Sequence, residues 1–287
     1  MSRYIVHGAN GAQGAPLLKR LIHSGHNAIA AARNTDSVKG MPCVKVDNTS
    51  VASLIVAYKE AKGVFIHLPV AAEAERFIHA QNIAEAIKQT KPDRVIISTS
   101  GWVVDNPASP LQNPPSSAIA ELIRGVQESG VSFAVVAPRL FFENLLNPLV
   151  LDAVKSEGVL RYPIRADYPV SWCSHLDVAE VAEKLFTDTT VTGLVGVGQS
   201  PAITGEQLAE GFERYLKRPV AFSSVGPQAF GDMIAPLFGA DAAAGVVAAY
   251  VAQANASANA ITGNTSAQLQ LALTPRTVDQ WLAEISA

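Results

Sequence analysis

A glycine-rich turn near the start of the chain constrains the fold more than any other feature. Its sequence is Gly8-Ala9-Asn10-Gly11-Ala12-Gln13-Gly14, in which the glycines follow the spacing GxxGxxG. The strand-like run Tyr4–His7 precedes the turn, and a helical pattern over Gly11–Ser24 follows it. Glycines at such a junction permit a tight turn and a close approach of the backbone to a pyrophosphate. We therefore predict a dinucleotide-binding turn; an ordinary glycine-rich turn is the alternative.

The first 140 residues alternate short β-branched runs with longer helical patterns. This alternation is typical of βαβ units, whose strands form a parallel sheet with helices on both faces. We therefore predict an α/β fold with a doubly wound Rossmann sheet. The predicted strands are Tyr4–His7, Ala28–Ala32, Cys43–Val46, Gly63–Leu68, Arg94–Ser98 and Ser132–Ala137, and the predicted helices are Gly11–Ser24, Ser50–Ala61, Ala71–Thr90 and Ser116–Ser129.

After Arg139 the pattern becomes richer in helices, which predicts a smaller cap at the carboxyl ends of the sheet strands. We assign residues 1–140 to a nucleotide-binding domain and residues 141–287 mainly to the cap, with later segments returning to the sheet. Asp177 is expected to cap the helix that it begins. The predicted cap helices are Phe142–Glu157, Asp177–Thr187, Thr204–Leu216 and Gln228 to about Asn255, and the predicted strands are Leu194–Val197 and Val220–Ser223.

Charge is scarce, because only 16% of the 287 residues are charged and the net charge is −3. Without a cluster of basic residues, nucleic-acid binding is not expected. The two cysteines, Cys43 and Cys173, are expected to be reduced and buried, which favours the cytoplasm. No secretory signal is expected at the N-terminus. The six histidines form no metal-ligand pattern, so no metal site is predicted.

The neutral segment, Ala242–Pro275, contains no charged residue. Its polar residues and its many alanines argue against a membrane span. We expect this segment to line an apolar cleft or to pack against a second subunit of a homodimer.

The residue after the second predicted strand bears on the type of dinucleotide. A site that prefers NAD places an acidic residue there to bond the ribose 2′-hydroxyl, whereas this chain has Arg33. Because a guanidinium can form paired, charge-assisted bonds to a 2′-phosphate, we predict NADPH as the cofactor. A solvated loop arginine is the alternative.

Other polar residues follow the third, fourth and fifth predicted strands. Asp47-Asn48 could accept a hydrogen bond from an adenine amino group, although a turn explains this pair almost as well. His67-Leu68-Pro69 and Ser98-Thr99-Ser100 end their strands at the edge where open α/β sheets bind ligands. We expect the latter two groups to face the nicotinamide half of a dinucleotide.

Taken together, the glycine-rich turn, Arg33, the Ser98-Thr99-Ser100 strand end, Pro138 with Phe141-Phe142-Glu143-Asn144, and Asp177-Val178-Ala179 resemble one family. The chain is similar to the NmrA-like branch of the atypical short-chain dehydrogenases, and within it to quinone oxidoreductases and triphenylmethane dye reductases. The resemblance implies a Rossmann domain, a closing cap and NADPH. The cofactor-binding residues that it implies are Gly8, Asn10, Gly11, Ala12, Gln13, Gly14, Arg33, His67, Leu68, Pro69, Thr99, Ser100 and Pro138.

The chain departs from the Tyr-x-x-x-Lys pattern of typical short-chain dehydrogenases. Arg124 occupies the lysine position and Ala120 the tyrosine position. Without that tyrosine, alcohol–ketone interconversion is disfavoured. A quinone-like or other conjugated apolar acceptor needs a hydride and can take its proton from solvent. We therefore predict a reductase of such acceptors, with Ser100 and Arg124 as weak catalytic candidates.

Two other functions remain open. Members of the same branch act as regulators that sense NADP(H) without turnover, and the missing tyrosine is compatible with that role. Sugar-nucleotide epimerisation ranks third, because it ordinarily needs the tyrosine. For Arg124 itself, a solvated surface position is as well supported as a role in binding a ribose hydroxyl or a developing anion.

Overall fold

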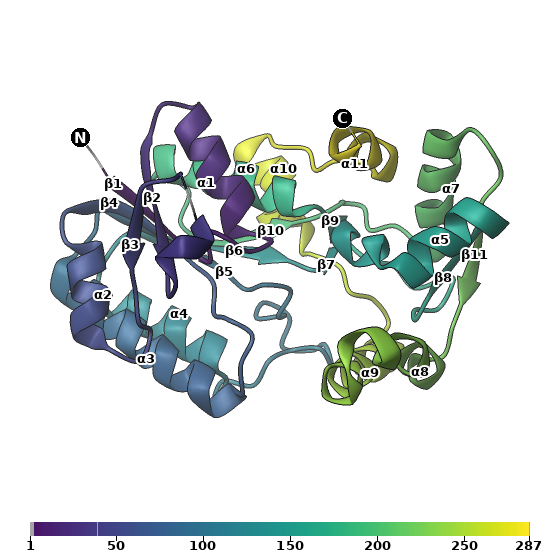
Figure 1. The fold of residues 1–287 in the computed structure, drawn as a ribbon, viewed down its shortest axis with the longest axis horizontal. Helices are drawn as coiled ribbons and strands as arrows, with labels where there is room; N and C mark the ends of the chain where they lie inside the picture. The colour runs from purple at the N-terminus through teal and green to yellow at the C-terminus, as the bar shows by residue number, and fades with distance from the viewer. Residues whose placement is uncertain (1–2, 39, 287) are drawn as a thin grey trace.

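The computed structural model describes residues 3–38 and 40–286. A seven-stranded parallel sheet with the order β10-β6-β5-β4-β1-β2-β3 forms its centre (Figure 1). The strand order reverses between β1 and β4, which makes the sheet doubly wound and confirms the predicted fold class. The strands are β1 (Arg3–His7), β2 (Asn27–Ala32), β3 (Cys43–Lys45), β4 (Ala61–Ile66), β5 (Arg94–Ser98), β6 (Phe133–Pro138) and β10 (Gly193–Val197).

Helices cover both faces of the sheet (Figure 1). Because successive strand side chains point to opposite faces, Val6 packs with α1 and α6, whereas Ile5 packs with α2, α3 and α4. Ser50 caps the second helix by accepting a hydrogen bond from the Ser53 amide. The helices are α1 (Gly14–His23), α2 (Val51–Tyr58), α3 (Glu73–Thr90), α4 (Ala118–Glu128) and α6 (His175–Thr187).

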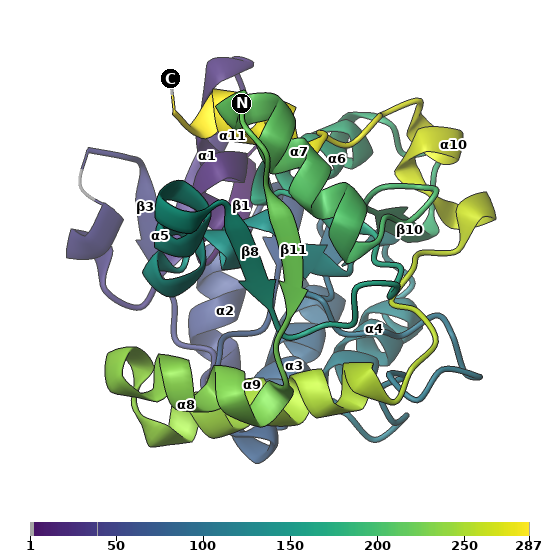
Figure 2. The ribbon, with the colours of Figure 1, turned by 90° about the vertical axis from the view of Figure 1, so that its right-hand side faces the viewer.

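A smaller helix-rich part begins where β6 ends. Its core is aromatic, with the Phe142 ring 5.9 Å from the Trp172 ring and 5.2 Å from the Trp281 ring. Figure 2 shows β8 beside β11, with α8 and α9 running below them. The elements are β7 (Leu140–Phe141), α5 (Pro148–Glu157), β8 (Val159–Tyr162), β9 (Trp172–Cys173), α7 (Gly205–Leu216), β11 (Ala221–Ser224), α8 (Pro227–Phe238), α9 (Ala240–Ala254) and α11 (Val278–Ile285). The short helix α10 (Ala267–Leu271) returns to the central sheet and packs with α6 and β10. Three short 3₁₀ helices span Thr35–Val38, Phe142–Leu146 and Gly263–Thr265.

Two predicted cap helices are each divided in the structure. The alanine-rich segment forms α8 and α9, because Gly239 adopts φ +86° and ψ 158° between them, a conformation that favours glycine. The segment Phe142–Glu157 begins as a 3₁₀ helix and continues as α5 only after Asn147. Asn147 is extended because the following residue is Pro148, which disfavours the helical conformation.

Two single-residue predictions are also wrong. The N-cap of α6 is Ser174 rather than Asp177, which is the third helical residue and accepts a hydrogen bond from the Ser174 amide at 2.7 Å. Local sequence shows both residues as good caps, and the capping box uses both of them. Cys173 is buried, but Cys43 is exposed because β3 is the edge strand of the sheet.

Within the described residues, no helix has the length and apolar character needed to cross a membrane. The same residues contain no group of three or more histidine, cysteine, aspartate or glutamate side chains suited to hold a metal ion.

Candidate functional site

The glycine-rich turn closes tightly between β1 and α1. The Gly11 amide donates to the Gly8 carbonyl at 2.8 Å, and Gly8 has φ +60°. A Cβ atom on Gly14 would lie 2.3 Å from the Gly8 carbonyl oxygen, so a side chain there requires the backbone to move. The turn therefore holds the N-terminus of α1 against the end of β1, where backbone amides and the helix dipole favour an anion.

Gln13 connects this turn to the end of β5. Its Oε1 accepts a hydrogen bond from the Ser98 hydroxyl at 2.6 Å, and its Nε2 donates to the Ser100 hydroxyl oxygen at 2.9 Å. Gln13 and Ser98 are buried. The structure thus brings together two predicted groups of site residues that are about 85 positions apart in sequence, and it directs Gln13 toward the strand end.

The buried His7 and the half-buried His67 lie close to the turn. A Cβ atom on Gly8 would lie 2.1 Å from His67 Nε2, so the imidazole occupies the space that a larger residue would need. His67 Nε2 has no hydrogen-bond partner among the described residues. His7 Nε2 lies 2.7 Å from the Tyr58 hydroxyl. Burial, with a smaller contribution from His67, lowers the pKa of His7 to about 3, so His7 is neutral at pH 7 and the hydroxyl donates to it.

Arg33 is exposed directly after β2, and none of the ion pairs formed by the described residues involves it. The adjoining 3₁₀ turn is tied to the glycine-rich turn, because Asn10 Nδ2 donates to the Ser37 hydroxyl oxygen at 3.1 Å. That hydroxyl donates to the Asn34 carbonyl at 2.6 Å. Ser37 was not predicted as a residue near the site. Its position shortly after Arg33 could have indicated that it lies close to the glycine-rich turn.

The remaining predicted positions differ in their surroundings. Asp47 Oδ1 accepts hydrogen bonds from the Thr49 hydroxyl at 2.7 Å and the Thr49 amide at 2.8 Å, and these bonds lower the pKa of the exposed Asp47 carboxyl. This is the turn geometry that the sequence left as an alternative, so a contact with adenine stays a prediction. Asn10 and Ala12 are exposed, Asn48 and Pro69 are half-buried, and Leu68, Thr99 and Pro138 are buried.

A cavity of about 510 Å³, here called the cleft, adjoins the end of β5. It is open between the loop that follows β5, the segment after β6, and α9. The neutral segment contributes four lining residues, in agreement with the prediction that it lines an apolar cleft. The lining residues are Ser100, Gly101, Trp102, Val103, Pro110, Leu111, Gln112, Asn113, Pro114, Arg139, Leu140, Phe141, Asn144, Ala249, Ala252, Gln253 and Asn259.

Arg139 is the one charged residue that lines the cleft in the described part of the chain. Its side chain is 1% exposed, and its Nη2 lies 2.6 Å from Asp105 Oδ1, whose side chain is 9% exposed. Arg139 Nε also donates to the Ala260 carbonyl at 3.3 Å. Because a close carboxylate neutralises the guanidinium, the cleft has no free charge to offer a ligand.

Behind the cleft, Glu143 and His175 link the segment after β6 to α6. Glu143 Oε1 accepts hydrogen bonds from the Ser174 hydroxyl at 2.6 Å and the His175 amide at 3.1 Å. The His175 ring lies 4.1 Å from the ring of Phe141, which lines the cleft. Burial raises the pKa of Glu143 and lowers that of His175 to about 4. The His175 imidazole is therefore uncharged at neutral pH.

Arg124 lies apart from these residues. Its side chain is 64% exposed, pairs with Glu121, and lines a different cavity of about 400 Å³ with Ile123, Phe133 and Leu194. The structure therefore does not bring Arg124 together with Ser100, the other catalytic candidate.

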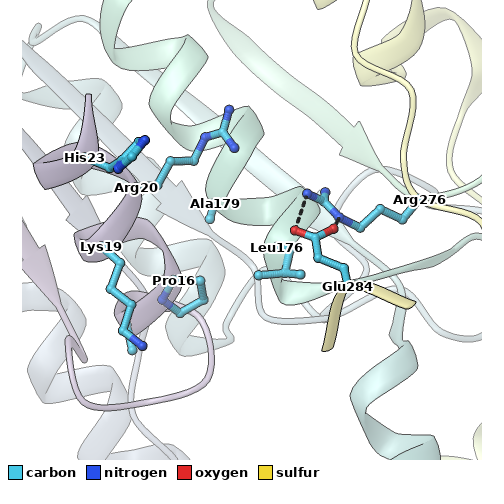
Figure 3. A pocket seen from close by; sticks show the side chains of 9 residues that line it. Pro16, Lys19, Arg20, His23, Leu176, Ala179, Arg276 and Glu284 are labelled. Atoms are coloured by element: carbon cyan, nitrogen blue, oxygen red, sulfur yellow. Dashed lines mark hydrogen bonds and ion pairs between the residues drawn. The ribbon is translucent and has the colours of Figure 1, made fainter. Parts of the chain in front are cut away.

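A further hollow of about 590 Å³ lies between α1, α6 and the C-terminal segment (Figure 3). Lys19, Arg20 and His23 line it from α1, and Arg276 and Glu284, which pair with each other, line it from the C-terminal segment. Acidic partners neutralise both arginines, since Arg20 pairs with Glu183 and Arg276 Nε lies 2.5 Å from Glu284 Oε2. The hollow shares no lining residue with the cleft.

The strand order and the glycine-rich turn after β1 define a doubly wound α/β fold of the Rossmann type. The NmrA-like family matches residues 1–282, and the chain belongs to this family. This confirms the resemblance drawn from the glycine-rich turn and the Phe-Phe-Glu-Asn block.

Three relatives illustrate the range of similar proteins. The (4-alkanoyl-5-oxo-2,5-dihydrofuran-3-yl)methyl phosphate reductase of Streptomyces griseus subsp. griseus is 29% identical over 231 residues, which are 78% of each protein. The triphenylmethane reductase of Citrobacter sp., solved with NADP(H), has a TM-score of 0.80 and 14% identity over 98% of this chain and 99% of its own. The NADPH-dependent quinone oxidoreductase of Escherichia coli, solved with NADPH, has a TM-score of 0.75 and 16% identity over 99% and 100%.

Proposed function

We propose that this protein is an NADPH-dependent reductase that transfers a hydride to a conjugated apolar acceptor in the cleft. The main support is the junction made by Gln13, which joins the glycine-rich turn to Ser98 and Ser100. A cofactor on the turn and an acceptor in the cleft would meet at Ser100, which lines the cleft. The reductase from Streptomyces and the two NADP(H)-bound neighbours agree with this chemistry.

The residues present fit a phosphorylated dinucleotide. Glycine at positions 8 and 14 permits the tight turn that holds the N-terminus of α1 against the end of β1, where backbone amides can bind a pyrophosphate. Arg33 is exposed and forms no ion pair with a described residue, so its guanidinium is free to hold a 2′-phosphate. Bound NADPH supplies the hydride from its nicotinamide.

The chain's own groups favour an acceptor that needs no strong acid from the protein. Burial keeps His7 and His175 deprotonated at neutral pH. The Ser100 oxygen accepts from Gln13, which leaves its hydroxyl hydrogen free to donate to an acceptor oxygen. Ser100 would thereby stabilise negative charge that develops on that oxygen, and water would supply the proton.

Stopped-flow measurement of NADPH absorbance against a panel of quinones and triphenylmethane dyes tests the proposal. We expect turnover with at least one acceptor and a lower kcat in S100A, with NADPH affinity retained. Tight NADPH binding with no turnover of any acceptor would contradict the proposal and favour the alternative of an NADP(H)-sensing regulator.

A further inference from the structure

Trp102 is an exposed aromatic side chain held at the mouth of the cleft. It is 44% exposed and lines the cleft beside Gly101 and Val103. The guanidinium carbon of Arg76 lies 5.1 Å from the centroid of the indole ring, in a cation–π arrangement. One face of the indole is therefore covered by Arg76, and the other face is available to a ligand.

Arg76 is itself fixed by contacts between α3 and α4. Its side chain is 9% exposed, and its Nη1 donates to Glu73 Oε2 at 2.6 Å. The other oxygen of Glu73 accepts from the Ala118 amide, at the N-terminus of α4, at 2.7 Å. The support behind the indole thus belongs to two helices packed on the sheet, so its position is set by the body of the protein.

The loop that carries Trp102 is also held in place. The Trp102 amide donates to the Thr99 carbonyl at 3.1 Å, and the Asn113 amide donates to the Val103 carbonyl at 2.8 Å. A side chain that is already ordered loses little conformational entropy when a ligand stacks on it. The exposed face of Trp102 therefore has the properties of a preformed platform.

Apart from the Ser100 hydroxyl and Arg139, which pairs with Asp105, the polar side chains that line the cleft include several neutral amides. Gln253 of α9 is 7% exposed, and its Oε1 accepts from Asn259 Nδ2 at 3.4 Å. No hydrogen bond donated by Gln253 Nε2 is formed within the described residues. Gln253 Nε2 can therefore donate a hydrogen bond to a carbonyl oxygen of a ligand. Because Asp105 neutralises Arg139, the cleft offers no counter-ion to an acidic group.

From these observations we propose that Trp102 and Gln253 determine acceptor specificity: the cleft takes an uncharged, planar, conjugated carbonyl compound that stacks on the indole and accepts a hydrogen bond from Gln253 Nε2. The inference rests on the proposed reductase function, whose acceptor it narrows. Stacking holds substrate and transition state alike, so loss of the platform changes KM and leaves kcat nearly constant.

Binding to the NADP⁺-loaded protein tests this inference without turnover. Isothermal titration calorimetry would measure Kd for 2-methyl-1,4-naphthoquinone and for 1,4-naphthoquinone-2-sulfonate. We expect W102A to raise Kd for the uncharged quinone about 3- to 10-fold, and W102F to stay within about 2-fold of wild type. Q253L should raise the same Kd about 5-fold. The sulfonate should bind at least about 10-fold more weakly than the uncharged quinone.

Two controls separate stacking from other causes. W102L keeps apolar bulk without an aromatic plane and should resemble W102A. L269A removes an exposed apolar side chain of α10 that does not line the cleft, and it should match wild type. An unchanged quinone Kd in W102A and W102L, or equal binding of the sulfonate, would overturn the inference. Failure of the reductase proposal would show separately, as absence of NADPH oxidation by wild type.

Discussion

Mild acid should destabilise the folded protein through two buried histidines. The pKa of His7 falls from 6.5 to about 3 on folding, mainly by desolvation, and that of His175 falls to about 4. Between these values and 6.5 the unfolded chain binds more protons than the folded one, so stability falls as pH falls. From pH 7 to pH 5, each histidine should remove about 2 kcal/mol from the free energy of unfolding.

Urea unfolding of wild type, H7Q and H175Q at pH 7 and pH 5 measures this effect. Circular dichroism and tryptophan fluorescence should give coincident transitions, so that a free energy can be extracted. The loss between the two pH values should be about 2 kcal/mol smaller in each variant than in wild type, and about 4 kcal/mol smaller in the double variant. Equal losses in wild type and H7Q would refute the reasoning that burial keeps His7 uncharged.

Four further substitutions probe the turn, the phosphate contact and the neutral segment. G14A places a methyl group 2.3 Å from a backbone carbonyl oxygen and should weaken NADPH binding, measured by cofactor fluorescence, by at least about 10-fold. R33D should weaken NADPH about 10- to 100-fold and leave NADH within about 3-fold; equal effects on both would remove the 2′-phosphate assignment. V247D puts a charge on a half-buried side chain packed against α8 and should cost about 2 kcal/mol in a denaturation assay. V251D, on a side chain 46% exposed, should stay within about 0.5 kcal/mol of wild type.

Local features of the chain were enough to predict most of the sheet. The run Arg94–Ser98 has β-branched residues at its centre and is fully buried, as is typical of a central parallel strand. A Cβ atom on Gly14 would lie 2.3 Å from the Gly8 carbonyl oxygen, so the turn in the structure needs glycine at that position. Errors arose where competing local signals were similar in strength, as with Ser174 and Asp177 as helix caps.

The sequence alone determined the fold class, the glycine-rich turn and the family, because each depends on local motifs and on their order along the chain. Tertiary structure decided which of the candidate residues meet. Gln13 reaches Ser98 and Ser100, and Trp102 is supported by Arg76, only because β1 and β5 lie on either side of β4 in one sheet and α3 packs on that sheet. Arg124 was separated from the cleft for the same reason: contacts between distant segments depend on how helices pack on the sheet, and no local pattern of residues records that packing.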